Sequence, residues 1–220
     1  MWNAMGLVLQ PPLKLGSAIL PKPRPQPVSL PSEVLKQPST PKPELDASLA
    51  RLQAGSSAWV RVDVAERASL LKTCMDNMVR HAEDFARLGV AAKGSYGSGL
   101  GEEMTGLLPV VLGLSEYIQS MRANAQLPAL DTRTAPNGAP VIKVFPRGML
   151  GALFPGCLGE VWCAPGKPVT QGAVYRKKEA GEGGKGGVAL VLGAGNQPSV
   201  VILDFLHKLV AEDEVVIAKL

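Results

Sequence analysis

Two glycines lie between an apolar run and the start of a helix near the end of the chain. Gly193 and Gly195 follow the run 188–192, and Pro198 suits the first turn of a helix. Glycine lets the backbone approach a phosphate closely, and a helix N-terminus attracts negative charge. The match to a dinucleotide fingerprint is incomplete, because Pro198 stands where the third glycine belongs. A glycine turn that only reverses the chain is an equally open interpretation.

Two further residues at this end of the chain could contact a cofactor or substrate, namely Asn196 and Lys219. An asparagine just before a helix that begins with proline is also what helix capping alone would select. A lysine at the end of a strand is commonly only solvated. The usual dinucleotide site has an Asp or Glu at that place. A structural and a functional interpretation therefore stay open for both side chains.

The elements around these residues predict one βαβ unit. The run 188–192 (VALVL) is continuously apolar, as in a strand buried on both faces, and 214–218 (EVVIA) predicts a second buried strand. Strands joined through a helix are expected to be parallel, with a right-handed connection. The helix between them is indicated by an apolar stripe of Ile202, Phe205, Leu206, Leu209 and Val210.

Two helices are expected earlier in the chain. Asp63 and Glu66 have the spacing of an N-cap and its capping-box partner, and they predict one long helix that ends near Gly89 or Gly94. A second helix is expected over 101–123. The apolar side of the first helix is predicted to be Leu71, Cys74, Met75, Met78, Ala82 and Phe85. That of the second helix is predicted to be Leu108, Val111, Leu112, Leu114 and Ile118.

The chain between the second helix and the βαβ unit is expected to be mostly irregular. Residues 124–139 are rich in turn signals, whereas 141–145 alternate as a strand does. The stretch 141–165 reads as strand and loop, and it is a candidate arm for oligomerisation. Residues 176–187 (RKKEAGEGGKGG) predict a mobile, solvated loop.

The three cysteines, Cys74, Cys157 and Cys163, do not indicate a metal site or a disulfide framework. They form no C-x-x-C pair, and the chain has only two histidines, His81 and His207. No metal site is therefore expected. Nothing in the sequence places a cation or a helix N-terminus beside these thiols, so structural roles are expected for all three.

Residues 1–45 have the composition of a disordered, proline-rich leader. Ten of the nineteen prolines lie there, and five basic against two acidic residues give +3 of the net charge of +4. The nearly neutral remainder argues against a nucleic-acid partner, and no apolar run is long enough for a membrane span. The expected localisation is cytoplasmic. The absence of acids from the first 32 residues keeps organelle import through the leader as an alternative.

The segment 188–219 resembles the first strand, turn, helix and second strand of the cofactor domain in the aldehyde dehydrogenase superfamily. In that family the turn carries an asparagine, a variable position and a proline, and the second strand ends in a lysine. Asn196, Pro198 and Lys219 match that pattern, with Lys219 following Asn196 at the family's spacing. Upstream, Trp59 and 65–71 (AERASLL) are similar to the family's first long helix, and 145–162 resembles a divergent subgroup.

The resemblance implies an α/β fold over 46–220, with amino-terminal helices and the first βαβ unit of a Rossmann-like cofactor domain whose sheet is incomplete. It implies NAD or NADP as cofactor, an aldehyde or acyl small molecule as substrate, and a homo-oligomeric full-length form. Asn196 would donate its amide to the oxyanion of a cysteine thiohemiacetal, and Lys219 would hold the adenosine ribose. The backbone around Gly193 and Gly195 would border the cofactor.

The family's nucleophilic cysteine and general-base glutamate lie beyond the second strand, so the chain is expected to be a truncated dehydrogenase without its nucleophile. One βαβ unit leaves strand edges unpaired, so such a chain is expected to be poorly stable or prone to aggregate. The alternative is a non-catalytic interaction or oligomerisation module that keeps this fold.

Overall fold

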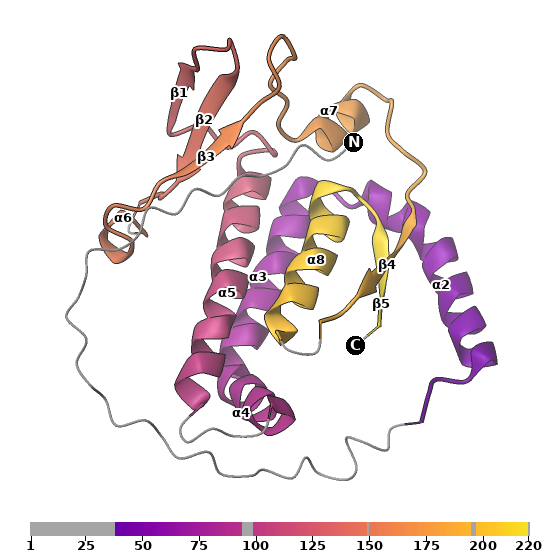
Figure 1. Ribbon diagram of the computed structural model, residues 1–220. Coiled ribbons are helices and arrows are strands. Elements are labelled where there is room, and N and C mark those ends of the chain that lie inside the picture. Colours follow the sequence, from indigo (N-terminus) through magenta and orange to yellow (C-terminus); the bar gives the residue numbers. More distant parts are fainter. Residues whose placement is uncertain (1–37, 94–98, 149, 195–196, 220) are drawn as a thin grey trace, which may run out of the picture. The chain divides into compact units, whose positions relative to one another are not determined.

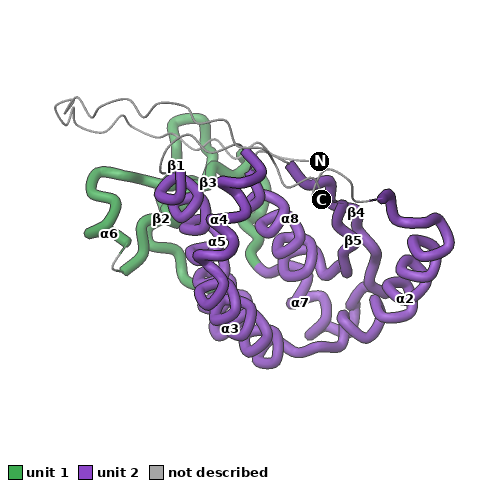
Figure 2. The backbone as a smooth tube through the Cα atoms, turned by 90° about the horizontal axis from the view of Figure 1, so that it is seen from below, with its two compact units in different colours: residues 1–21, 127–171 green, residues 22–126, 172–220 purple. Residues whose placement is uncertain are grey.

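The computed structural model describes residues 38–93, 99–148, 150–194 and 197–219 (Figure 1). Their structure mixes helices and strands, as expected for an α/β protein. The described chain forms two compact units (Figure 2). We call Leu127–Gln171 the small unit and the remaining described residues the large unit. In the described ranges, no helix combines the length and apolar character needed to cross a bilayer.

The first helix of the large unit begins within the segment expected to be a leader. Helix α2 spans Lys42–Arg61, with Pro41 at the N-cap position and Pro43 in its first turn. The predicted boundary of the leader, residue 45, is therefore too late. Proline favours the first turn of a helix because its fixed φ suits that position and the missing N–H has no partner there in any case. The rest of the predicted leader, 1–37, lies outside the described residues.

The predicted cap at Asp63 is confirmed, whereas the predicted single long helix is wrong. The Asp63 carboxylate accepts a hydrogen bond from the Glu66 N–H at 2.8 Å, at the start of α3 (Val64–Arg80). The chain leaves the helical conformation at His81, and α4 (Ala82–Lys93) follows. Both helices pack against α5. Apolar spacing continues across the break, so the periodicity alone could not locate it.

Helix α5 (Leu100–Arg122) matches the predicted second helix in extent but not in its buried face. Leu114 and Ile118 are buried as expected, whereas Leu108 is exposed and Leu107 and Val110 are buried instead. The middle of this helix, 107–114 (LLPVVLGL), is apolar on every side, so the sequence did not select one face. The main core lies among α3, α5 and α8 and contains Ala68, Leu71, Val110, Leu114, Ile118, Met121, Ala125, Tyr175, Leu206 and Val210.

The small unit contains a three-stranded antiparallel sheet. Its strands, in the order β1-β2-β3, are Asp131–Thr134, Pro140–Phe145 and Gly159–Trp162, and the short helix α6 covers Leu150–Leu153. The strand predicted at 141–145 is confirmed. The prediction of turns alone for 124–139 missed β1, because β1 is polar and exposed and is held by pairing with β2 and by contacts of Arg133 with Glu160 and Trp162 on β3.

Helix α7 (Ala173–Glu179) includes the first four residues of the segment predicted to be a loop at 176–187. Tyr175 anchors this helix in the core, and the adjacent RKKE residues have good helix propensity. The prediction was therefore wrong for 176–179. The glycine-rich remainder has no regular secondary structure.

The last three elements join two parallel strands through a helix, as predicted. They are β4 (Val188–Leu192), α8 (Pro198–Ala211) and β5 (Val215–Lys219). The two strands lie between α8 and α2, which both contact them (Figures 1 and 2). Burial of β4 on both faces is contradicted, because Leu190 and Leu192 are 63% and 67% exposed while Ala189 and Val191 are buried. Only one face of this strand is well covered in the described structure.

Candidate functional site

The carboxyl ends of β4 and β5 bring two of the predicted site residues together. Leu192 is the register partner of Lys219, and the Gly193 N–H donates a hydrogen bond of 2.7 Å to the Lys219 carbonyl. The residues are 26 positions apart in the sequence (219 − 193), and parallel pairing alone makes them neighbours. We call Gly193 and Lys219 the strand-end site. Gly195 and Asn196, the other two predicted site residues, lie outside the described residues.

Gln197 is a residue of this site that the sequence did not single out. Its N–H donates to the Ala194 carbonyl at 3.3 Å, and its own carbonyl accepts from the Val200 N–H at 3.1 Å. Its side-chain amide donates a long hydrogen bond of 3.4 Å to Ser199 Oγ, and Ser199 is buried. Gln197 thus connects Ala194 to the first turn of α8. The signal available in the sequence was only its position between Asn196 and Pro198.

The strand-end site has residue types that fit a dinucleotide. Parallel strands present their carboxyl ends beside the start of the following helix, which is where open α/β sheets bind such ligands. The Lys219 side chain is exposed, so its ammonium is accessible to hydroxyl or phosphate groups. Leu192, on the same face of the strand pair, adds exposed apolar surface beside that cation. Polar and apolar contacts are therefore available within one small area.

A buried ionic cluster lies elsewhere in the large unit, centred on Arg67. The Arg67 side chain is 0% exposed, and its guanidinium lies 4.2 Å from the centre of the Trp59 ring. It donates hydrogen bonds to the Asp213 carboxylate at 2.5 Å and to the Tyr175 hydroxyl at 3.2 Å. Further bonds reach three backbone carbonyls, those of Trp59, Val62 and Leu209. Arg67 thereby links α2, α3, α7 and the end of α8.

Asp213 is shared between two cations in this cluster. The Lys178 Nζ atom forms an ion pair of 2.7 Å with the second carboxylate oxygen. Burial lowers the pKa of Lys178 from its ordinary value, and the contact with Asp213 opposes that change. Burial likewise raises the pKa of Tyr175, whose hydroxyl donates to the Val210 carbonyl at 2.6 Å. The charged and polar side chains of this cluster therefore bind one another.

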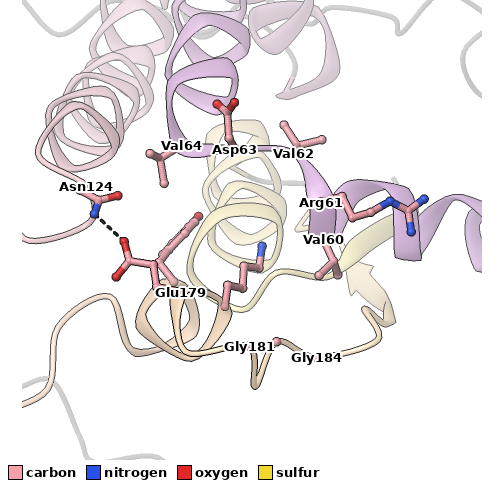
Figure 3. Close-up of a pocket in the computed structure, with 12 residues that line it drawn as sticks. Val60, Arg61, Val62, Asp63, Val64, Asn124, Glu179, Gly181 and Gly184 are labelled. Carbon is pink, nitrogen blue, oxygen red and sulfur yellow. Dashed lines mark hydrogen bonds between the residues drawn. The ribbon is translucent and has the colours of Figure 1, made fainter.

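A cavity of about 750 Å³ lies beside this cluster (Figure 3). It is bounded by the α2–α3 connection, by α7 and by the glycine-rich segment after α7, and its wall includes Lys178, Glu179, Gly181 and Gly184. The charged groups at its edge are largely occupied, since Glu179 accepts a hydrogen bond of 2.6 Å from the Asn124 amide. Neither Gly193 nor Lys219 lines this cavity, so the cavity is not part of the strand-end site.

The cysteines are free thiols on different parts of the chain. Cys74 is exposed on α3, although it was expected on the buried side of that helix. It lines an apolar groove together with Met78 and Phe85. Cys157 and Cys163 are partly buried in the small unit. Among the described residues, no group of His, Cys, Asp and Glu is arranged to hold a metal ion.

No protein-family model matches this chain, and no curated protein matches it. The function is therefore inferred from the residues of the strand-end site and from the parallel strands that bring them together.

Proposed function

We propose that this chain contains the beginning of a Rossmann-like, NAD(P)-binding domain of an aldehyde dehydrogenase-type oxidoreductase. The observation that carries the proposal is the hydrogen bond between Gly193 and Lys219 at the carboxyl ends of two parallel strands. Gly193 and Lys219 are both residues that the sequence analysis predicted from cofactor chemistry. Helix α8, which joins the two strands, begins at the same edge of the sheet. The sequence resemblance over 188–219 supports the same function.

Each residue of the site has a specific role in this proposal. The Lys219 ammonium binds the ribose hydroxyls of the cofactor, and the backbone at Gly193 and Gly195 borders it. The Asn196 side-chain amide donates a hydrogen bond to the oxyanion that forms when a thiolate attacks an aldehyde carbonyl. When bound, the dinucleotide supplies the hydride acceptor for aldehyde oxidation. Exposed Leu192 offers apolar surface next to Lys219 for an aromatic ring of the cofactor.

The nucleophile is not assigned to any of the three cysteines. The sequence resemblance implies a nucleophile beyond the second strand, whereas Cys74, Cys157 and Cys163 all precede β4. In this proposal the 220-residue chain binds the cofactor, and the thiol that attacks the aldehyde is none of these three cysteines. Cofactor binding is therefore the property to measure.

We expect Lys219→Ala to weaken the binding of NADH to the full 220-residue chain, measured by fluorescence titration. The loss should be on the order of tenfold, because a hydrogen bond to a charged group is removed. Lys177→Ala is the matched control, since Lys177 is an exposed lysine on α7, away from the strand-end site. Titration with NADPH in parallel shows which of the two cofactors the site prefers.

Two results would reject this function. One is the absence of NADH or NADPH binding by the unchanged chain at millimolar concentration, while circular dichroism shows it to be folded. The other is an equal loss of affinity in the Lys219 and Lys177 variants, which would show that the affinity depends only on the net charge of the chain.

A non-catalytic module for self-association is the second candidate function. The observation that favours it is the exposure of Leu190 and Leu192 on one face of β4. Large apolar side chains that are exposed next to one another commonly mark an interaction surface. This candidate predicts association that depends on these two leucines and is independent of any dinucleotide.

A further inference from the structure

Helix α8 lies against α5 at two glycines of α5. A Cβ atom added at Gly113 would lie 3.1 Å from Leu203 Cδ2, and one added at Gly106 would lie 3.5 Å from Gln197 Nε2. The two glycines are seven residues apart, about two helical turns, and so lie on the same side of α5. Figure 1 shows α5 and α8 in the same helical layer, and the two helices are in contact.

Gln197 connects this helix contact to the strand-end site. Its backbone is hydrogen-bonded to Ala194 on one side and to Val200 in the first turn of α8 on the other. Gly193, next to Ala194, is bonded to the Lys219 carbonyl. A displacement of the Gln197 backbone would therefore move Ala194 and the start of α8, while β4 and β5 are held by their own pairing.

We infer that Gly106 is a positioning residue for the strand-end site. It leaves the space on α5 that the Gln197 side chain occupies, and Gln197 in turn is hydrogen-bonded to Ala194, after β4, and to Val200, in the first turn of α8. The effect on cofactor affinity rests on the proposed function, whereas the effect on the turn does not. A methyl group at position 106 would meet Gln197 at ordinary van der Waals distance, but a larger side chain would occupy the same space as the amide.

The test compares Gly106→Leu with Gly101→Leu in the full chain. Both positions are on α5, but a Cβ atom at Gly101 has nothing within 4 Å, so the control makes the same change in open space. Hydrogen exchange of the peptide covering 193–200 is measured by mass spectrometry, together with NADH affinity. We expect faster exchange in the Gly106→Leu protein alone, and NADH binding weaker on the order of tenfold, because the bound geometry is displaced.

A second substitution separates positioning from general damage to the fold. Gln197→Ala removes the amide that the new leucine would meet, so the double variant should regain slow exchange in the turn, a non-additive result. Equal exchange in the two leucine variants would overturn the inference. So would failure of Gln197→Ala to restore the turn, including the case in which the Gly106→Leu protein and the double variant both unfold. If the unchanged chain does not bind NADH, the proposed function fails, and the exchange data still decide the role of Gly106.

Discussion

Arg67 shows how much one buried charge can organise in this chain. Its guanidinium meets a carboxylate, a tyrosine hydroxyl, three backbone carbonyls and the face of Trp59, so the desolvated cation is surrounded by acceptors. A buried charge is tolerated only when it is paired and hydrogen-bonded in this way. Asp213 adopts a left-handed backbone conformation, with φ of 63°, which directs the chain from α8 towards β5. Among non-glycine residues, aspartate is one of the less strained in that region.

We expect Arg67→Met to lower the free energy of unfolding by about 3–5 kcal/mol, because buried Asp213 would keep only Lys178 as a partner and the other buried acceptors around Arg67 would lose their donor. Urea denaturation followed by circular dichroism measures the change. Arg51→Met is the control, since Arg51 is exposed on α2 and bonds only to the nearby Ser48 hydroxyl in the described structure. A loss below about 1 kcal/mol for Arg67→Met, the ordinary range for an exposed pair, would show that the cluster is not a stability determinant.

At the scale of elements, the termini of α8 are the most informative. Its N-terminal turn begins with Pro198 and adjoins the strand-end site, and its C-terminal turn carries Lys208 and Glu212, four residues apart, in an ion pair. The hydrogen bond from Lys208 lowers the pKa of Glu212, with His207 adding to the effect, and the same contact raises the pKa of Lys208. Both shifts show that the ion pair favours the charged forms.

The Lys208–Glu212 pair predicts a specific dependence of stability on pH. The folded-state pKa of Glu212 is below its ordinary value of 4.5, so its contribution is present above pH 4.5 and is lost as the pH falls through the folded-state pKa. Lys208 is raised above 10.5, so its contribution is present below pH 10.5 and is lost as the pH rises through its folded-state pKa.

We expect Glu212→Gln to be less stable than the unchanged chain at pH 7, with the difference shrinking as the pH falls below 4.5. Thermal melts at several pH values measure this difference. Glu44→Gln, an exposed position in the first turn of α2, is the matched control. A difference that stays constant from pH 7 to pH 3 would show that the ion pair does not set the pKa of Glu212.

Some elements were predictable because a local signal marks them. Asp63 and Glu66 located the start of α3, and Pro198 located the start of α8, since caps and prolines act within one helical turn. The break at His81 and the strand β1 had no such signal. The break accompanies the packing of both α3 and α4 on α5, and β1 exists through its pairing with β2.

At the scale of the whole molecule, the described strands β4 and β5 form a sheet of only two strands. Helices α2 and α8 contact it, yet Leu190 and Leu192 are left more than half exposed. Large apolar side chains that are exposed next to one another commonly mark an interaction surface, and unpaired strand edges are prone to associate. In the proposed oxidoreductase, Leu192 on this surface contacts the cofactor, whereas in the interaction module both leucines form the contact between chains.

We expect the unchanged chain to self-associate, and the double substitution Leu190→Lys with Leu192→Lys to reduce that association. The reason is that charged side chains on the exposed face would have to be desolvated in the contact. Light scattering after size-exclusion chromatography measures the molecular mass. Leu88→Lys is the control, because Leu88 on α4 is equally exposed but far from β4 in sequence. Unchanged mass in the double variant would remove the observation that favours an interaction module.

The sequence by itself determined the elements with strong local or periodic signals: the Asp63 cap, the extent of α5, the start of α8, and two parallel strands separated by a helix. It also selected Gly193 and Lys219 as candidate cofactor residues, because their types suit phosphate and hydroxyl chemistry. Only the tertiary structure decided that these two residues are hydrogen-bonded neighbours, that Leu190 and Leu192 are exposed, and that Gln197 lies against Gly106. These features depend on strand register and helix packing between segments that are distant in the chain. No short segment of sequence determines that register or packing.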